Sequence, residues 1–199
     1  DTKGPLECRS VDGALHASLF VEMHSRFVDG KCLPNLQTTS VLSHLKRIVL
    51  LFRKIGRDVA ARLRTDNGSS YTSEQFEEAC RLYGFVHETT VPYRGQHANV
   101  TERYWRTLFG LVRCMIILSG APVTFWSFAF VYACVCLNLK NSRSDPSQTR
   151  YQAITGRPFP LQALHVLFCD CTAIVPGSPD NMGSLPPRHV PGMFVGVSS

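Results

Sequence analysis

The sequence lacks several features that would place it quickly in a common class of protein. It has no internal repeat and no low-complexity tract. Its hydrophobic content of 44% and its two tryptophans are typical of a folded globule rather than a disordered tail. It also lacks an initiator methionine and a charged-then-apolar leader, so we expect a piece of a longer protein. Its 199 residues are enough to bury one good core.

Zinc-finger spacing is missing as well, although the chain has eight cysteines. Cys134 and Cys136 are separated by one residue, as are Cys169 and Cys171, and no C-x₂-C pair is followed by suitably spaced histidines. We therefore interpret the cysteines as small buried apolar residues rather than zinc ligands or disulfides.

Charge is absent from Cys114 to Leu139, a span long enough for a transmembrane helix. Ser119–Pro122 (Ser-Gly-Ala-Pro) interrupts the span, because Gly and Pro disfavour a continuous helix there. The pattern predicts a buried helix hairpin, with a membrane anchor as the alternative.

Acidic residues are outnumbered, and the net charge of +6 fits a polyanionic partner without requiring one. The segment 46–64 holds seven Lys and Arg residues against one acid, Asp58. An ordinary solvated basic face explains this segment equally well.

What is present centres on Asp66, which follows the apolar run Val59–Leu63. That run predicts a buried strand, and Asn67-Gly68 predicts a turn directly after it. A carboxylate at the end of a strand lies where α/β sheets build their sites.

Glu102 lies 36 positions further on, near the start of a predicted helix that continues to about Ser119. Two or three carboxylates brought together would suit Mg²⁺ or Mn²⁺. The alternative is a common turn plus an unrelated surface glutamate.

The helix of Glu102 has two different sides at about 100° per residue. Asn99, Arg103, Arg106 and Arg113 fall beside Glu102, which predicts a stripe that follows a phosphate backbone. The apolar residues are expected on the opposite side: Tyr104, Trp105, Leu108, Phe109, Leu111, Val112, Met115 and Ile116. An exposed face with Glu102–Arg106 pairing is the alternative.

Further elements follow from periodicity and turn residues. Thr72 and Gln75 have capping-box spacing and predict a helix start, and Gly84 predicts its end. Strands are predicted at Ala14–Glu22, Phe27–Leu33, Phe85–Thr89, within Leu164–Val175 and at Gly192–Gly196, and a helix at Thr39–Ile55.

Three segments together resemble the catalytic core of copia-type retrotransposon integrases: TDNGSSYTS (65–73), GFVHETTVPY (84–93) and VTERYWRTL (100–108). As in that family, 35 residues separate the Asp of the turn from the Glu of the helix. The resemblance implies an α/β fold with an RNase H-like core. It implies a mixed five-stranded sheet with helices on both faces at residues 1–142, then a connector and small β extension at 143–199.

The resemblance also implies a chemistry. Asp1, in the pattern D-x-x-G-P, is similar to the family's first catalytic Asp, and a free amine beside it would add charge that the longer protein lacks. Asp1, Asp66 and Glu102 would then hold two Mg²⁺ (or Mn²⁺) ions about 3.5–4 Å apart for 3′-end processing and strand transfer. Residues implied to contact DNA are Arg94, Gln96, His97, Asn99, Arg103, Arg106 and Arg113.

The implied partners are retroelement ends, target DNA and further copies of the full-length protein, with no membrane. The implied place of action is the nucleus, after a stage in a cytoplasmic particle.

Some positions depart from the family pattern. Its Asn-Gly is Ala98-Asn99 here, its Thr-Pro is Arg94-Gly95, and its Lys-Asn after Glu-Arg is Tyr104-Trp105. Glu22 stands where the family often has Asp, and we interpret it as structural. These departures indicate a divergent copy. They leave two variations open: a catalytically inactive DNA-binding or assembly module, and a nuclease of the same fold.

Overall fold

The computed structural model describes residues 1–56, 62–90, 98–174 and 189–197. Three antiparallel strands form its central sheet in the order β1 (Thr2–Lys3), β2 (His16–Val21) and β3 (Val28–Leu33). Strands β2 and β3 pair along their whole length, from His16 opposite Leu33 to Val21 opposite Val28. Both were predicted, each with slightly wider bounds.

The turn between β2 and β3 is closed by Glu22. Its carboxylate accepts hydrogen bonds from the backbone N–H of His24 and of Ser25, each at 2.7 Å, and from the Ser25 hydroxyl at 2.5 Å. Partial burial opposes ionisation, but these hydrogen bonds lower the pKa of the Glu22 carboxyl below its usual value. The structural interpretation of Glu22 is therefore confirmed.

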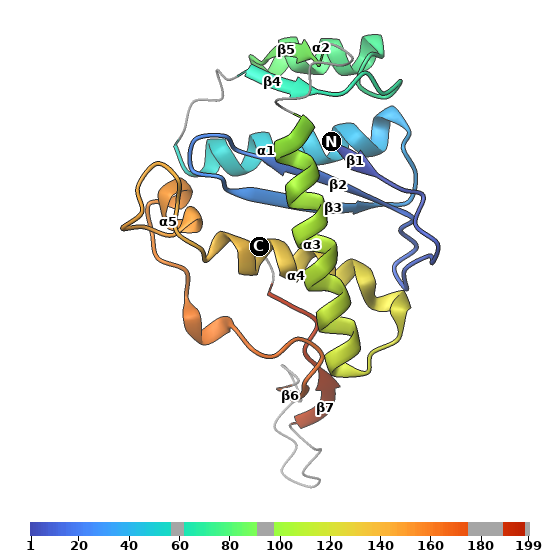
Figure 1. Cartoon of the computed structure of the whole chain (residues 1–199), viewed down its shortest axis with the longest axis vertical. Helices are drawn as coiled ribbons and strands as arrows, with labels where there is room; N and C mark the ends of the chain where they lie inside the picture. Colours follow the sequence, from blue (N-terminus) through green and yellow to red (C-terminus); the bar gives the residue numbers. More distant parts are fainter. Residues whose placement is uncertain (57–61, 91–97, 175–188, 198–199) are drawn as a thin grey trace, which may run out of the picture.

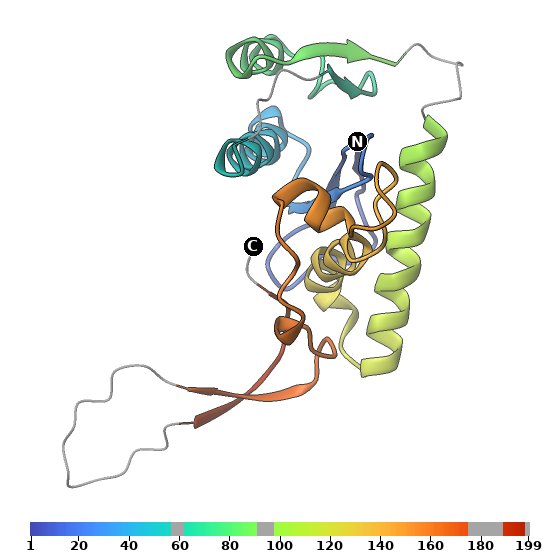
Figure 2. The same cartoon turned by 90° about the vertical axis from the view of Figure 1, so that its left-hand side faces the viewer.

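Helices cover both faces of this sheet, as predicted (Figures 1 and 2). Helix α1 (Thr38–Lys54) lies against one face. Helices α3 (Ala98–Ser119) and α4 (Trp126–Asn138) lie against the other. Alternating residues of the strands serve the two sides: Ala17 and Leu19 join the core under α3 and α4, whereas Ser18 meets His44 of α1.

A second sheet pairs β4 (Arg62–Thr65) and β5 (Val86–Thr89) in parallel, with α2 (Glu74–Tyr83) between them in the chain. Helix α2 ends at Gly84, whose φ of +80° is the left-handed cap that was predicted. The predicted cap at its start was wrong by one residue. Ser73, not Thr72, accepts the hydrogen bond from the backbone N–H of Phe76, because Ser73 has the extended backbone that a cap requires.

All five strands expected of the core are present, but in the described residues their hydrogen bonds form two sheets, not one mixed sheet. Strand β1 has only two residues and pairs with β2 alone. Apolar side chains join the β4–β5 sheet to the rest instead. Their cluster includes Leu33 of β3, residues of α1 and α2, and Tyr71.

The uncharged span folds as the predicted helix hairpin. Helix α3 ends before Gly120, whose φ is +66°, and a short 3-10 turn, Val123–Phe125, leads into α4. Among the described residues no helix is both long and apolar enough to span a bilayer. Helix α4 is buried instead, and its Asn138 side chain bonds both the N–H and the C=O of Val28, at 2.8 and 2.7 Å.

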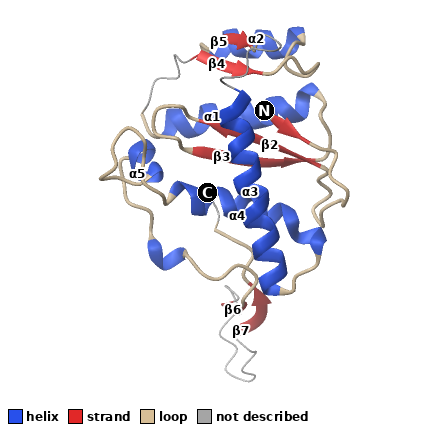
Figure 3. Ribbon diagram, viewed as in Figure 1, coloured by secondary structure: helices blue, strands red, loops and turns tan. Residues whose placement is uncertain are grey.

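The C-terminal part begins with α5 (Arg150–Thr155), a helix that we had not predicted, and a 3-10 turn at Leu161–Ala163. Strands β6 (Asp170–Ile174) and β7 (His189–Met193) then form an antiparallel ladder that projects from the body (Figures 2 and 3). The ring of Phe194 packs against Tyr132 of α4. The division of the chain at residue 142 stays a prediction.

All eight cysteines are free thiols, as predicted. Cys80 and Cys134 are buried, and burial raises the pKa of both thiols. The prediction that all are buried was wrong for Cys114 and Cys171, which are exposed, and held only in part for the four half-buried cysteines, Cys8, Cys32, Cys136 and Cys169.

Candidate active site

Asp1 is held by the backbone ladder of β2. Its amino group donates to the carbonyl oxygen of Leu19 at 3.1 Å, and the N–H of Leu19 donates to the carbonyl oxygen of Asp1 at 2.8 Å. The Asp1 carboxylate accepts a hydrogen bond from the indole Nε1–H of Trp105 at 3.0 Å. Asp1 is thus fixed at both its backbone and its side chain.

Asp66 is exposed at the end of β4, in the predicted turn. Its Oδ1 accepts a hydrogen bond from the N–H of Gly68 at 3.1 Å, and Asn67 Nδ2 donates to the carbonyl oxygen of Thr90 at 3.2 Å. A Cβ on residue 68 would lie 3.1 Å from Asp66 Oδ1, which is tighter than ordinary contact. Glycine at this position therefore lets the turn close around the carboxylate.

Electrostatics places Asp1 and Asp66 in one neighbourhood. Burial lowers the pKa of the Asp1 amino group to about 6, and the negative charge of Asp66 partly opposes this. Burial also raises the pKa of Tyr71, and the charge of Asp66 adds to that rise. The charge of Asp66 therefore reaches both the amino group of Asp1 and Tyr71.

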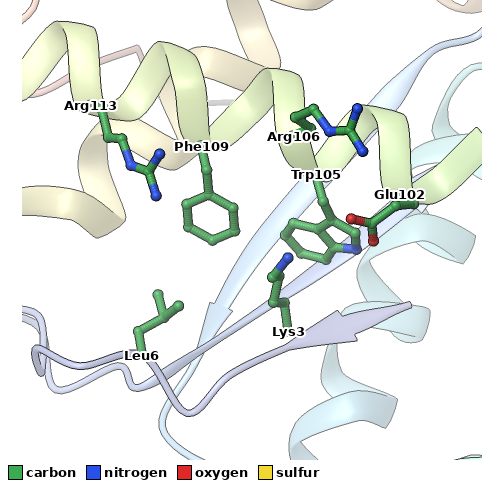
Figure 4. A pocket seen from close by; sticks show the side chains of 7 residues that line it. All are labelled: Lys3, Leu6, Glu102, Trp105, Arg106, Phe109 and Arg113. Atoms are coloured by element: carbon green, nitrogen blue, oxygen red, sulfur yellow. The ribbon is translucent and has the colours of Figure 1, made fainter.

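Glu102 is exposed on α3 and lines a cavity of about 300 Å³ between α3 and the start of the chain (Figure 4). Arg106 and Arg113 line the same cavity, as the predicted stripe requires. Figure 4 shows the side chains on one side of the helix; the full lining is Lys3, Leu6, Glu102, Trp105, Arg106, Phe109 and Arg113.

The expected separation of polar and apolar sides on α3 was wrong for Trp105 and Phe109. Both line the cavity beside Glu102. Trp105 lies one turn from Glu102, and Phe109 lies between the two arginines at helical spacing. The polar stripe therefore borders an aromatic wall.

The carboxylates of Asp1, Asp66 and Glu102 do not form a complete metal site in the described arrangement. Within the described parts of the chain, no three His, Cys, Asp or Glu side chains lie close enough together to hold a metal ion. Three carboxylates have the right donor chemistry for Mg²⁺, since hard cations prefer oxygen ligands. Asp1 and Asp66 share a neighbourhood, but the described arrangement does not add Glu102 to them as a third ligand.

The predicted DNA-contacting residues fall in two groups, one before α3 and one on it. Arg94, Gln96 and His97 lie outside the described residues, and Asn99 lies in the first turn of α3. Arg103 is exposed on α3, next to Glu102.

Sequence reasoning missed two residues at this site. Lys3 lies over the ring of Phe109, with its Nζ 5.8 Å from the ring centroid. The period of two in a strand could have found it, because Lys3 follows Asp1 by two positions and shares its face. Trp105 had no such signal, since its bond to Asp1 joins residues 104 positions apart.

A buried polar chain supports the strand that ends at Asp66. His87 of β5 has a side chain only 3% exposed, and its Nδ1 lies 2.6 Å from Glu77 Oε1 of α2. Its Nε2 lies 2.8 Å from the hydroxyl of Thr65. Because a carboxylate can only accept, Nδ1 donates to Glu77. The Thr65 hydroxyl in turn donates to the carbonyl oxygen of Asp66 at 3.0 Å. This chain of hydrogen bonds ties α2, β5 and β4 together one residue before Asp66.

Comparison with known families gives a match to the integrase core domain over residues 1–95. The chain carries an integrase core domain. The matched segment includes Asp1 and Asp66 and ends before Glu102. The predicted kinship with retroelement integrases is thereby confirmed.

Sequence relatives extend the likeness over most of the chain. The Retrovirus-related Pol polyprotein from transposon TNT 1-94 of Nicotiana tabacum is 32% identical over 196 residues, 98% of this chain. The corresponding polyprotein from transposon RE2 of Arabidopsis thaliana is 23% identical over 167 residues, 81% of this chain. The chain spans only 14% and 11% of the length of these two polyproteins.

Solved structures show the same fold. The intasome of simian T-cell lymphotropic virus has a TM-score of 0.59 and 20% identity, covering 94% of this chain and 64% of that one. The HTLV-2 integrase catalytic core in complex with magnesium has a TM-score of 0.55 and 21% identity, covering 70% and 84%. The RNase H-like α/β fold class predicted for the integrase core is confirmed.

Proposed function

We propose that this integrase core carries out 3′-end processing and strand transfer of retroelement DNA, with Asp1, Asp66 and Glu102 as its metal-binding carboxylates. The observation that carries the proposal is the linkage of the three residues. The charge of Asp66 reaches the amino group of Asp1, and a hydrogen bond from the Trp105 indole joins the Asp1 carboxylate to the helix that carries Glu102.

A divalent ion at these carboxylates would activate the attacking water or 3′-hydroxyl and stabilise the leaving oxygen. Magnesium is the ion in the HTLV-2 core structure, which has the same fold. The proposal requires that Glu102 approach Asp1 and Asp66 when ion and DNA bind.

The arginines of α3 have a positioning role in this proposal. Arg106 and Arg113 line the cavity next to Glu102, and guanidinium groups bind phosphate oxygens with two parallel hydrogen bonds. They would hold the DNA backbone beside the carboxylates and take no part in bond breaking. Arg94, Gln96, His97, Asn99 and Arg103 remain predicted DNA contacts.

A catalytically inactive DNA-binding or assembly module is the second candidate. One observation favours it: the described residues hold no complete group of metal ligands. This candidate retains the fold and the arginines of α3, so it predicts DNA binding that does not depend on Glu102.

Strand transfer by the full-length parent protein with Mg²⁺ distinguishes the two. We expect Asp66→Asn and Glu102→Gln each to reduce strand transfer by about 100-fold or more, since even an outer-shell partner of a metal ligand can contribute that much. Glu78→Gln, an exposed carboxylate of α2 away from the site, is the matched control and should retain activity.

DNA binding, measured by fluorescence anisotropy, completes the design. Arg106→Ala with Arg113→Ala should weaken binding under both candidates, most at low salt. Equal strand transfer by wild type, Asp66→Asn and Glu102→Gln contradicts the proposed enzyme. If neither wild type nor any variant shows strand transfer, and Glu102→Gln still binds DNA, the result supports the inactive module.

A further inference from the structure

The side chain of Trp105 is almost fully buried, at 1% exposure, and it points its one polar atom at Asp1. The indole Nε1 lies 3.0 Å from Asp1 Oδ2, a good hydrogen-bond distance. In Figure 4 the indole nitrogen lies on the Glu102 side of the ring. One side chain thus joins the first strand to the helix of Glu102.

An aromatic stack fixes the orientation of the indole. Its ring stacks on Phe109 of the same helix and on Phe130 of α4, with centroids 5.7 Å away in both cases. The interplanar angles are 21° and 15°. Rotation of Trp105 would break both contacts, so its N–H keeps one direction.

The indole N–H leaves the Asp1 carboxylate able to bind a cation. A carboxylate has about four acceptor positions on two oxygens, and one donor on Oδ2 occupies only one of them. The ladder with Leu19 fixes the backbone of Asp1, and the indole fixes its side chain. Together they leave the carboxylate one orientation.

We propose that Trp105 is a positioning residue that holds the Asp1 carboxylate in the orientation needed to bind the metal ion. This inference rests on the proposed function, in which Asp1 is a metal ligand. It assigns a role to a residue that departs from the family pattern. Hydrogen-bonded partners of metal ligands orient those ligands and raise metal affinity.

Nuclear magnetic resonance of the two indole N–H groups tests the inference in the unmodified chain. The chain has two tryptophans, and Trp126 donates its N–H to the carbonyl oxygen of Cys8 at 2.9 Å, which makes it an internal control. We expect Mg²⁺ to shift the Trp105 indole signal saturably and to leave that of Trp126 in place. A Trp105 signal that does not respond to saturating Mg²⁺ would show that no ion binds at Asp1 beside the indole, which overturns the inference.

Replacement of Trp105 by 3-benzothienylalanine isolates the N–H, because sulfur takes its place in a ring of the same shape. We expect the affinity for Mn²⁺, measured by electron paramagnetic resonance of the free ion, to fall about 10-fold. The same replacement at Trp126 should leave Mn²⁺ affinity unchanged, and thermal unfolding should show that both variants fold.

The outcomes separate the two proposals. If wild type binds Mn²⁺, Asp66→Asn does not, and the variant at position 105 binds as tightly as wild type, the role of Trp105 is overturned while the metal site stands. If wild type binds no Mn²⁺, the proposed metal site itself fails.

Discussion

At Gly30, strand β3 packs closely against helix α4. A Cβ at this position would lie 2.6 Å from Cys134 Sγ and 2.7 Å from Phe130 Cε1. Both neighbours belong to the main core, which holds α4 against the sheet. Phe130 also stacks on Trp105, so the packing at Gly30 extends to the candidate site.

We expect Gly30→Ala to lower the free energy of unfolding by about 1–3 kcal/mol, the usual cost of overpacking a core. Gly110→Ala is the control, because Gly110 lies inside α3 with nothing within 4 Å of a new Cβ. Alanine there should stabilise the protein by about 0.5–1 kcal/mol. Urea unfolding measures both, and a neutral Gly30→Ala would show that α4 moves away from the sheet easily.

For single residues, the sequence correctly predicted those structural roles that depend only on the adjacent residues in the chain. The turn after Asp66 follows from Asn67-Gly68, and the end of α2 follows from Gly84. Serine and threonine are both good cap residues, so their identities do not decide between Thr72 and Ser73. Ser73 is the cap because it has the extended backbone conformation. The contact of Trp105 with Asp1 depends on the packing of α3 against β1, and no local pattern carries that information.

Among the elements, α1 and β3 are joined by a buried polar network. Asp29 of β3 accepts hydrogen bonds from His44 Nε2 at 3.0 Å and from Arg47 of α1. The other ring nitrogen of His44 accepts from the hydroxyl of Ser18, at 2.7 Å. Burial lowers the pKa of His44 despite Asp29, so the network holds a neutral imidazole.

This network predicts loss of stability in acid. Because the folded pKa of His44 is lowered below 6.5, the unfolded chain takes up a proton first, and stability falls as the pH drops below about 6.5. Burial opposes ionisation of Asp29, but His44 and Arg47 together lower its pKa below 3.8, so a second loss follows at lower pH.

Urea unfolding between pH 8 and pH 4 checks the first loss. We expect a slope of up to about 1.4 kcal/mol per pH unit from one proton. His44→Gln retains a polar side chain without a titrating group and should flatten the curve below pH 6.5. An equal slope in wild type and His44→Gln would assign the acid sensitivity to other groups.

A helix or strand could be predicted when the sequence pattern that specifies it lies within its own residues. Helix α1 and the α3–α4 hairpin were found because apolar spacing and the Gly-Pro break are local. Helix α5 was missed because its six residues have no room for a periodic pattern. The division of the five strands into two sheets depends on which strands pair across the chain, and the pattern within a single strand does not report this.

For the whole molecule, the division of the strands into two sheets separates the candidate ligands. Asp1 belongs to the ladder of the first sheet, and Asp66 follows a strand of the second. A divalent ion bound by both would join the two sheets, and binding to the folded state alone stabilises a protein.

We therefore expect Mg²⁺ to raise the melting temperature of wild type, by an amount that grows with ion concentration. An ion at about 100 times its dissociation constant adds about 2.7 kcal/mol. Asp66→Asn should abolish the increase, whereas Glu78→Gln should retain it. Differential scanning calorimetry provides the measurement, and an equal increase in all three proteins would place the ion elsewhere.

Tyr71 lies where the two sheets pack together. It is 5% exposed, lies in the apolar cluster that joins the two sheets, and is close enough to Asp66 for that charge to raise its pKa. The relative position of the two aspartates therefore depends on this apolar cluster and on side-chain hydrogen bonds such as that from Ser70 to the carbonyl oxygen of Leu36, since the described residues form no backbone ladder between the two sheets. We therefore expect substitutions in this apolar cluster to displace the two aspartates relative to each other, and so to impair the proposed metal site, before they unfold the protein.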